Sequence, residues 1–412
     1  MSLDSRRAII DQATLLIAEA GVRGASLRKV GSRSGVNFAR LAADFGGKDG
    51  LIAACFADVV ERDVARLRAI VDEHDGMTTG PELAALFLWA LCQDAGGPRQ
   101  NDYLVLTELL LASGRPELSE IFRQWILRRQ DILRAMAARA GLDPIAFDIL
   151  GLIVLMEGGF SISNYNSPAY RLIARASFNE AFVRLTGLGE RAYVAALHAL
   201  AMRYHINADD QPAARAPDGA DDAAQGRNQI IEAAAAIIEE QGLDGLTNRA
   251  VATRAGVSLA LTTYHFRSIT ELALAGLRRS VENFASRLEP EATRAQQRST
   301  MLAARHTFSD ASERDVRLHR GMLQVSLTAA RSGRDVHLGH LVRRQVGMAA
   351  YAAVDADKRD SITRTSAASY SLWAGAVYLV SPSFPEIGQP FDFNAQANLA
   401  GRCLLGIDLA LD

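Results

Sequence analysis

The sequence of 412 residues contains little cysteine, few aromatic side chains and no large excess of one charge. Its three cysteines, Cys55, Cys92 and Cys403, lie far apart and are odd in number. They provide neither a disulfide framework nor paired metal ligands, so we expect a reduced, cytoplasmic location. The formal net charge of −2 excludes a histone-like polycation. It does not exclude a local patch for nucleic acid, because such a patch depends on where the charges lie.

Long apolar runs and enzyme signatures are also missing. No stretch approaches the roughly 18 uninterrupted apolar residues that a membrane-spanning helix needs, and the N-terminus lacks the apolar segment of a secretory signal. The run Gly151–Gly159 contains Glu157, so we predict a buried helix there. Asp335, His337 and His340 have helical spacing but no further clear ligand, and we interpret them as a surface group. Nucleotide-binding and hydrolase motifs are absent, so we expect no catalytic residues, metal, cofactor or membrane partner.

What the sequence does contain is a repeat. Residues 6–51 align with residues 227–272 at a constant offset of 221 without a gap, and 16 of the 46 positions are identical. The shared positions include glycines and apolar residues at helical spacing, which predicts two copies of one structural unit. The abundance of alanine favours helix, so we predict an all-α chain built from a tandem duplication.

The second copy carries the signals of a helix-turn-helix. An amphipathic helix is followed by Thr247, which can cap a short second helix, and by a turn at Gly256. Ser258 can cap the third helix, and a capping box of Ser268 and Glu271 begins the fourth. A helix, a glycine turn and a second capped helix form the motif that places a helix in the major groove of DNA.

The first copy repeats this plan, with caps at Ser26 and Asn37 and a turn at Gly35. Residues 247–272, TNRAVATRAGVSLALTTYHFRSITEL, resemble the DNA-binding signature of the TetR (tetracycline-repressor) family of bacterial transcription regulators. Residues 26–51, SLRKVGSRSGVNFARLAADFGGKDGL, resemble it less closely. The resemblance implies that each half has a small DNA-binding head and a larger helical body, which binds effectors and dimerises.

The repeat and the resemblance together predict five regions. Residues 207–226 are rich in Pro, Asp, Gly and Ala and are expected to form a linker. The predicted regions are a degenerate first head (1–51), a first body (52–206), the linker (207–226), a second head (227–272) and a second body (273–412).

The resemblance also assigns candidate contacts to DNA. In the second head these are Thr247, Arg249, Ser258, Thr262, Thr263, Tyr264 and His265, whereas Phe266 is expected in the core. In the first head they are Ser26, Arg28, Asn37, Arg40 and Lys48. The first head replaces Tyr264 and His265 by Ala43 and Asp44, but it carries a net charge of +4 over 6–51 against −1 over 227–272. It is expected either to bind DNA in an altered way or to have lost operator recognition.

The two bodies are predicted to be helical throughout. Helices are expected near 81–94, 101–112, 117–140, 145–164, 176–204, 296–309, 312–331, 335–352, 359–380 and 394–411, with a loop at 381–385. In the family the last two long helices of each body pair, which implies an internal four-helix bundle here. The candidate ligand contacts are Trp89, Tyr103, Trp125, Met156, Tyr165, His319, Met322, Trp373 and Tyr378, although plain core is the alternative for each.

These observations predict a ligand-responsive transcriptional regulator, most simply a repressor, that forms a covalent pseudo-dimer. Its expected partners are a double-stranded DNA operator and a small hydrophobic or aromatic effector. The two halves are expected to pair internally, and a further homodimer stays open. The alternative is a helical small-molecule sensor or protein-interaction module whose first head no longer binds operator DNA. Nothing in the sequence supports an enzyme.

Overall fold

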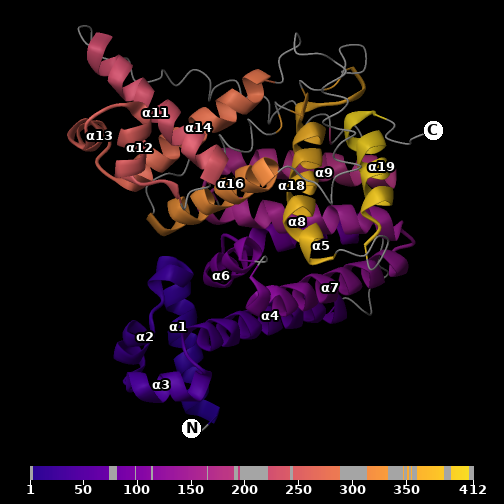
Figure 1. The fold of residues 1–412 in the computed structure, drawn as a ribbon. Helices are drawn as coiled ribbons and strands as arrows, with labels where there is room; N and C mark the ends of the chain where they lie inside the picture. The colour runs from indigo at the N-terminus through magenta and orange to yellow at the C-terminus, as the bar shows by residue number, and fades with distance from the viewer. Residues whose placement is uncertain are drawn as a thin grey trace.

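The computed structural model describes residues 3–73, 81–97, 99–112, 115–164, 166–189, 194, 221–241, 245–287, 313–332, 347, 350–351, 354, 360–384 and 391–407. Within these ranges every regular element is helical, and there are sixteen α-helices (Figure 1). The prediction of an all-α fold is therefore confirmed for the described chain. Tyr165 and the Asp335–His340 group lie outside it, as does the helix expected at 296–309.

Two groups of four helices begin the two halves of the chain. The first consists of α1 (Leu3–Gly24), α2 (Leu27–Ser34), α3 (Phe38–Phe45) and α4 (Lys48–Glu73). The second consists of α11 (Asp221–Gln241), α12 (Asn248–Ala255), α13 (Leu259–His265) and α14 (Ile269–Arg287). Helices α2, α3 and α4 each begin 221 residues before α12, α13 and α14, which is the offset of the sequence alignment.

The same local signals begin and end these short helices. Ser26 caps α2 by accepting a hydrogen bond from the Lys29 amide at 3.3 Å, and Thr247 caps α12 by accepting one from the Ala250 amide at 3.1 Å. A glycine in the left-handed conformation follows each helix. It is Gly35 after α2, with a φ of 69°, and Gly256 after α12, with a φ of 67°. The predicted caps and turns of both heads are thus present.

The first body contains α5 (Pro81–Asp94), α6 (Gln100–Leu111), α7 (Pro116–Arg139), α8 (Pro144–Asn164) and α9 (Pro168–Thr186). The first four agree with the predicted helices to within one residue. The prediction of a helix over 176–204 is wrong in its boundaries. The helix α9 begins earlier because Ser167 caps it, and it ends at Thr186 because Gly187 adopts a left-handed φ of 73°.

The second body contains α16 (Glu313–Ser332), α18 (Arg364–Val380), the short 3-10 helix η3 (Ser381–Ser383) and α19 (Phe393–Leu405). Helix α18 begins later than predicted because Thr363 and Ser366 form a capping box, and α19 ends early at the left-handed Gly406. The predicted linker is also too long at its C-terminal end. Its last six residues, 221–226, belong to α11, and residues 207–220 lie outside the described part.

Helices α8, α9, α18 and α19 each pack against the other three, so two helices of each body form one four-helix cluster. The Ser369 hydroxyl donates a hydrogen bond to the Ser177 carbonyl across it at 3.0 Å. Helix α8 is apolar and long enough to cross a membrane, but 94% of its most apolar window is buried inside the protein. As predicted, it is a core helix, and its Glu157 accepts a hydrogen bond from the Tyr170 hydroxyl.

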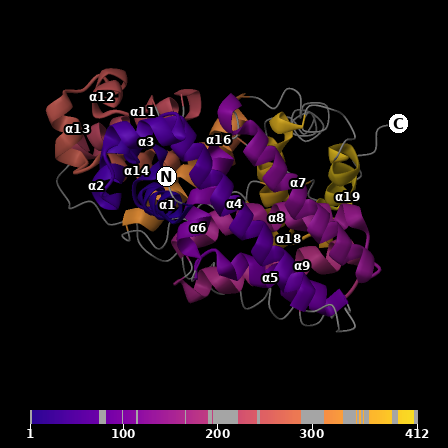
Figure 2. The ribbon, with the colours of Figure 1, turned by 90° about the horizontal axis from the view of Figure 1, so that it is seen from below.

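Helix α16 occupies a central place in the fold. It packs against α11 and α14 of its own half and also against α1, α6 and α8 of the first half (Figure 1). Helix α6 likewise packs against α1 and α4. In both views α2 and α3 lie on the same side of the molecule as α12 and α13, away from α19 (Figure 2).

Candidate DNA-binding heads and their connection to the bodies

The second head presents most of its predicted DNA contacts to solvent. Tyr264 is 79% exposed, and Thr247, Arg249, Ser258 and Thr263 are exposed as well. The Ser258 hydroxyl oxygen is already used as the cap of α13, where it accepts a hydrogen bond from the Leu261 amide at 3.1 Å. The Thr263 hydroxyl donates to carbonyls of its own helix, whereas the Tyr264 side chain is largely exposed.

Two predicted contacts of α13 point elsewhere. Thr262 is fully buried, because it lies one helical turn before Phe266 on the face that packs into the head, as does its counterpart Leu41 in α3. The Nε2 atom of His265 is also buried and has no hydrogen-bond partner among the described residues. The prediction that the Thr262 side chain contacts DNA is therefore wrong. The expectation that Phe266 is a core residue is confirmed.

In the first head Arg28, Asn37 and Arg40 are exposed, whereas Ser26 and Lys48 are partly buried. The Asn37 carboxamide oxygen caps α3 by accepting a hydrogen bond from the Ala39 amide at 2.8 Å. The Arg40 guanidinium lies 3.5 Å from the Asp44 carboxylate, one helical turn away. This ion pair offsets part of the positive charge that α3 offers to phosphate groups.

The two heads share tertiary contacts at matched positions. Arg33 of α2 forms a two-pronged ion pair with Glu19 of α1, at 3.0 and 2.6 Å, and Arg254 of α12 forms the same pair with Glu240 of α11, at 2.5 Å for both bonds. Each residue of the first pair lies 221 positions before its counterpart. In both heads an arginine of the first helix also lies over the ring of a phenylalanine at the C-terminal end of the third helix. These contacts are Arg6 over Phe45 at 4.4 Å and Arg227 over Phe266 at 5.2 Å.

Sequence reasoning missed one pair of exposed residues. Phe38 and Leu259 are the first residues of α3 and α13, and they are 57% and 49% exposed. They occupy matched positions in the repeat. The signal that was available is an apolar residue directly after the cap of a recognition helix.

Helices α12 and α13, joined by the left-handed turn at Gly256, have the geometry of a helix-turn-helix DNA-binding domain. In a comparison with family models, residues 230–275 match the model described as "Bacterial regulatory proteins, tetR family". The second head thus contains a TetR-type helix-turn-helix domain, a type of domain that suggests DNA binding in transcriptional regulation. None of the curated proteins compared with the chain matches it.

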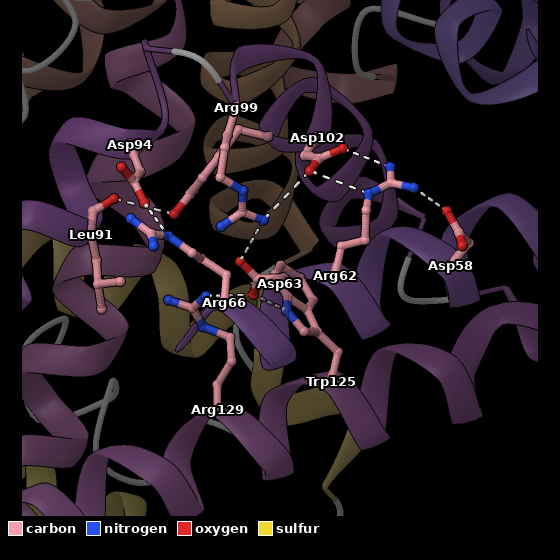
Figure 3. A network of polar contacts seen from close by, with 11 residues as sticks. Asp58, Arg62, Asp63, Arg66, Leu91, Asp94, Arg99, Asp102, Trp125 and Arg129 are labelled. Carbon is pink, nitrogen blue, oxygen red and sulfur yellow. Dashed lines mark hydrogen bonds and ion pairs between the residues drawn. The ribbon is translucent and has the colours of Figure 1, made fainter. Parts of the chain in front are cut away.

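A network of charged residues ties α4 to the first body (Figure 3). The buried Asp63 carboxylate accepts hydrogen bonds from the Trp125 indole at 2.8 Å and from Arg129 at 2.7 Å, and Arg99 lies 3.4 Å away. Burial alone would raise the pKa of Asp63, but the arginines and the indole outweigh it, so the pKa is lowered. The charge is therefore compensated, and it fixes α7 and α6 on α4.

The same network reaches the first helix of the head. Arg62 of α4 pairs with Asp102 of α6 at 2.7 Å and also with Asp58. Asp58 in turn pairs with Arg7 of α1. Arg99 pairs with both Asp63 and Asp102, so a continuous chain of ion pairs connects α1, α4, α6 and α7.

A small cavity lies where the two bodies meet. It is lined by Met156 and Phe160 of α8, His319 and Met322 of α16, and Ala368, Ser371 and Leu372 of α18. Its size allows about one water molecule. The His319 ring packs against Tyr378, with 5.4 Å between the ring centroids. Three predicted ligand contacts, Met156, His319 and Met322, thus line one cavity. A fourth, Tyr378, contacts the His319 ring beside it.

The other predicted ligand contacts are packed in the core. Trp125 is held by Asp63, and the Trp373 indole donates a hydrogen bond to the Gln396 side chain at 3.1 Å. The buried Tyr103 hydroxyl donates one to the Leu91 carbonyl at 3.2 Å. Trp89 packs against Phe178. Among the described residues no group of three His, Cys, Asp or Glu side chains is placed to hold a metal ion.

Proposed function

We propose that the protein is a transcriptional regulator that binds an operator in double-stranded DNA, most simply as a repressor. The observation that carries the proposal is the TetR-type head at 230–275, whose third helix leaves Tyr264 and Thr263 open to solvent. Hydroxyl groups of this kind bond phosphate oxygens and base edges. Arg249, at the start of α12, adds a cation for the phosphate backbone.

We propose further that the chain arose by tandem duplication and acts as a covalent pseudo-dimer. The matched helix starts, the matched Arg33–Glu19 and Arg254–Glu240 pairs and the shared four-helix cluster support this. Placement of α3 and α13 on one side of the molecule is what binding of both heads to one duplex requires.

The effector in this proposal is a small hydrophobic or aromatic molecule that binds at the cavity between α8, α16 and α18. The lining of methionine, phenylalanine and leucine with one histidine suits such a ligand. Because the cavity is small, a ligand must enlarge it, and in this proposal it does so by moving α16 away from α8. Since α16 also packs against α1 and α11, this movement changes the spacing of the heads.

The alternative function is a sensor or protein-interaction module in which the first head no longer binds operator DNA. The pairing of Arg40 with Asp44 favours it, because that pair withdraws a cation from the surface of α3. Under this alternative only the second head contacts DNA or a partner.

A mobility-shift assay with the DNA that flanks the gene of this protein tests the proposal. We expect a retarded complex whose affinity falls as the salt concentration rises. Footprinting of that complex separates the two functions. Protection of two half-sites about 34–36 Å apart supports binding by both heads, and protection of one half-site supports the alternative. Absence of any specific complex would refute both DNA-binding roles.

A further inference from the structure

Two exposed apolar residues mark the first position of both third helices. Phe38 and Leu259 keep about half of their surface in water, and they lie 221 residues apart, at matched positions in the two heads. A single exposed leucine is common on protein surfaces and needs no explanation. The occurrence of a large apolar residue at the same place in both heads does need one, because 30 of the 46 aligned positions differ.

Packing within the head does not explain these residues. The core-facing side of each third helix is formed by other positions, Leu41 with Phe45 at α3 and Thr262 with the following Phe266 at α13, and all four are buried. Phe38 and Leu259 instead follow the caps Asn37 and Ser258 directly. They lie at the N-terminal end of the third helix, and in a helix-turn-helix domain the residues at this end contact base edges.

The chemistry of the major groove identifies the ligand. Base edges there present hydrogen-bond donors and acceptors, and the apolar group among them is the C5 methyl of thymine. The exposed cations Arg28 and Arg40 of the first head and Arg249 of the second complement the phosphates that flank the groove. A duplex therefore fits this surface better than a neutral protein face does.

We infer that Phe38 and Leu259 each contact a thymine methyl group and so select a thymine in each half-site. This inference rests on the proposed function and deepens it by naming a feature of the sequence that both heads read. The heads then share thymine selection at this position. They differ at the following positions, where α13 offers Thr263 and Tyr264 and α3 offers Ala42 and Ala43.

Replacement of thymine by deoxyuridine tests the inference, because it removes only the methyl group. Each thymine of the footprinted operator is replaced in turn, and the dissociation constant is measured by fluorescence anisotropy. We expect one position in each half-site where replacement weakens binding by about fourfold, the effect of one buried methyl group. The variant Leu259→Ala should bind the thymine and the deoxyuridine operators with equal affinity when the replaced base lies in one half-site. Phe38→Ala should do so for the position in the other half-site.

The exposed Leu86 of α5 provides a matched control, because Leu86→Ala removes the same atoms outside the heads. It should keep the full sensitivity to deoxyuridine at both positions. Tight binding without any sensitivity to deoxyuridine would overturn this inference and leave the proposed function intact. Loss of self-association in Leu259→Ala, measured by sedimentation, with unchanged deoxyuridine sensitivity would assign the residue to a protein contact instead. Failure to bind DNA at all would overturn both proposals.

Discussion

The Arg331 guanidinium at the end of α16 donates a hydrogen bond of 2.7 Å to the carbonyl oxygen of Ala18 in α1. A second bond of 2.9 Å reaches the Ile17 carbonyl, and Glu108 of α6 pairs with the same guanidinium at 2.7 Å. These carbonyls lie just before Gly21, where α1 is kinked with a φ of 71°. A residue of the second body thus completes the hydrogen bonding of a helix in the first head.

Replacement of Arg331 by alanine should release this contact. Because bonds to charged groups contribute about 1.5–3 kcal/mol, we expect a loss of about 2 kcal/mol in unfolding free energy. Amide hydrogen exchange near residues 17–25 should accelerate, since α1 loses its partner. The control is Arg254→Ala, which removes a solvent-exposed ion pair and should leave the unfolding free energy nearly unchanged. Unchanged exchange in α1 would show that α16 does not restrain the first head.

The buried Asp63 gives a prediction about stability and pH. In Asp63→Asn the buried Arg129 loses its counter-charge, so the unfolding free energy near neutral pH should fall by about 3–5 kcal/mol. The pKa of Asp63 is lower in the folded than in the unfolded chain, so this stabilisation is present above about pH 3.9 and is lost as the pH falls below it. Urea unfolding of both proteins at several pH values should show their difference narrowing in acid.

Glu61, two positions earlier in α4, is the control for that experiment. Its pair with Arg128 is exposed on the carboxylate side, so Glu61→Gln should cost about 0–1 kcal/mol. An equal loss in both variants would contradict a special role of the buried network.

Gly375 of α18 has no side chain, and the His319 ring occupies the space that a Cβ atom would need. A Cβ atom there would lie 2.5 Å from Cδ2 of the His319 ring and 3.2 Å from the Met156 methyl. We therefore expect Gly375→Ala to lower the unfolding free energy by about 1–3 kcal/mol, measured by urea unfolding. The double variant Gly375→Ala, His319→Ala should recover most of the loss, because it removes the overlapping ring. A double variant less stable than the single one would show that the overlap is not the cause.

The two third helices should respond differently to substitution. Tyr264→Ala should weaken operator binding by about 1 kcal/mol because it removes a hydroxyl group from the exposed face, whereas Ala43→Gly removes no polar group. Footprinting and mobility-shift titrations of both variants measure the difference. A symmetric footprint on a perfect palindrome, equally sensitive to both changes, would contradict separate readout by the two heads.

Arg40 allows a test of charge in the first head. Arg40→Ala should lower the affinity for DNA and reduce the slope of its salt dependence by about one, because one phosphate contact is lost. Asp44→Asn should act in the opposite direction, since it frees Arg40 from its ion pair. The slopes are measured by titration at several salt concentrations. No change in either slope would place α3 away from the phosphates.

Much of this architecture follows from local signals in the sequence. Ser26, Thr247 and the glycines that end helices set the boundaries of the heads, because caps act over three or four residues. Helix α9 begins at Pro168, eight residues before the predicted start, because proline suits the first turn of a helix and Ser167 caps it. The resemblance to the family assigns Thr262 to the DNA-facing side, but its position one helical turn before Phe266 places it on the buried side. The Arg331–Ala18 contact joins residues 313 positions apart, and no periodicity reveals such a pair.

Helices α3 and α13 can mutate independently, which affects how the preferred operator sequence can evolve. In a regulator assembled from two identical chains, each change of a codon appears twice and alters both half-sites together. Here α3 and α13 are encoded by different stretches of one gene, while the cluster of α8, α9, α18 and α19 holds their bodies together. If both heads bind DNA as proposed, one mutation changes the recognition of one half-site and leaves binding at the other half-site intact. Such a protein can acquire a new operator sequence through two successive mutations, because one head keeps its affinity for DNA at each step.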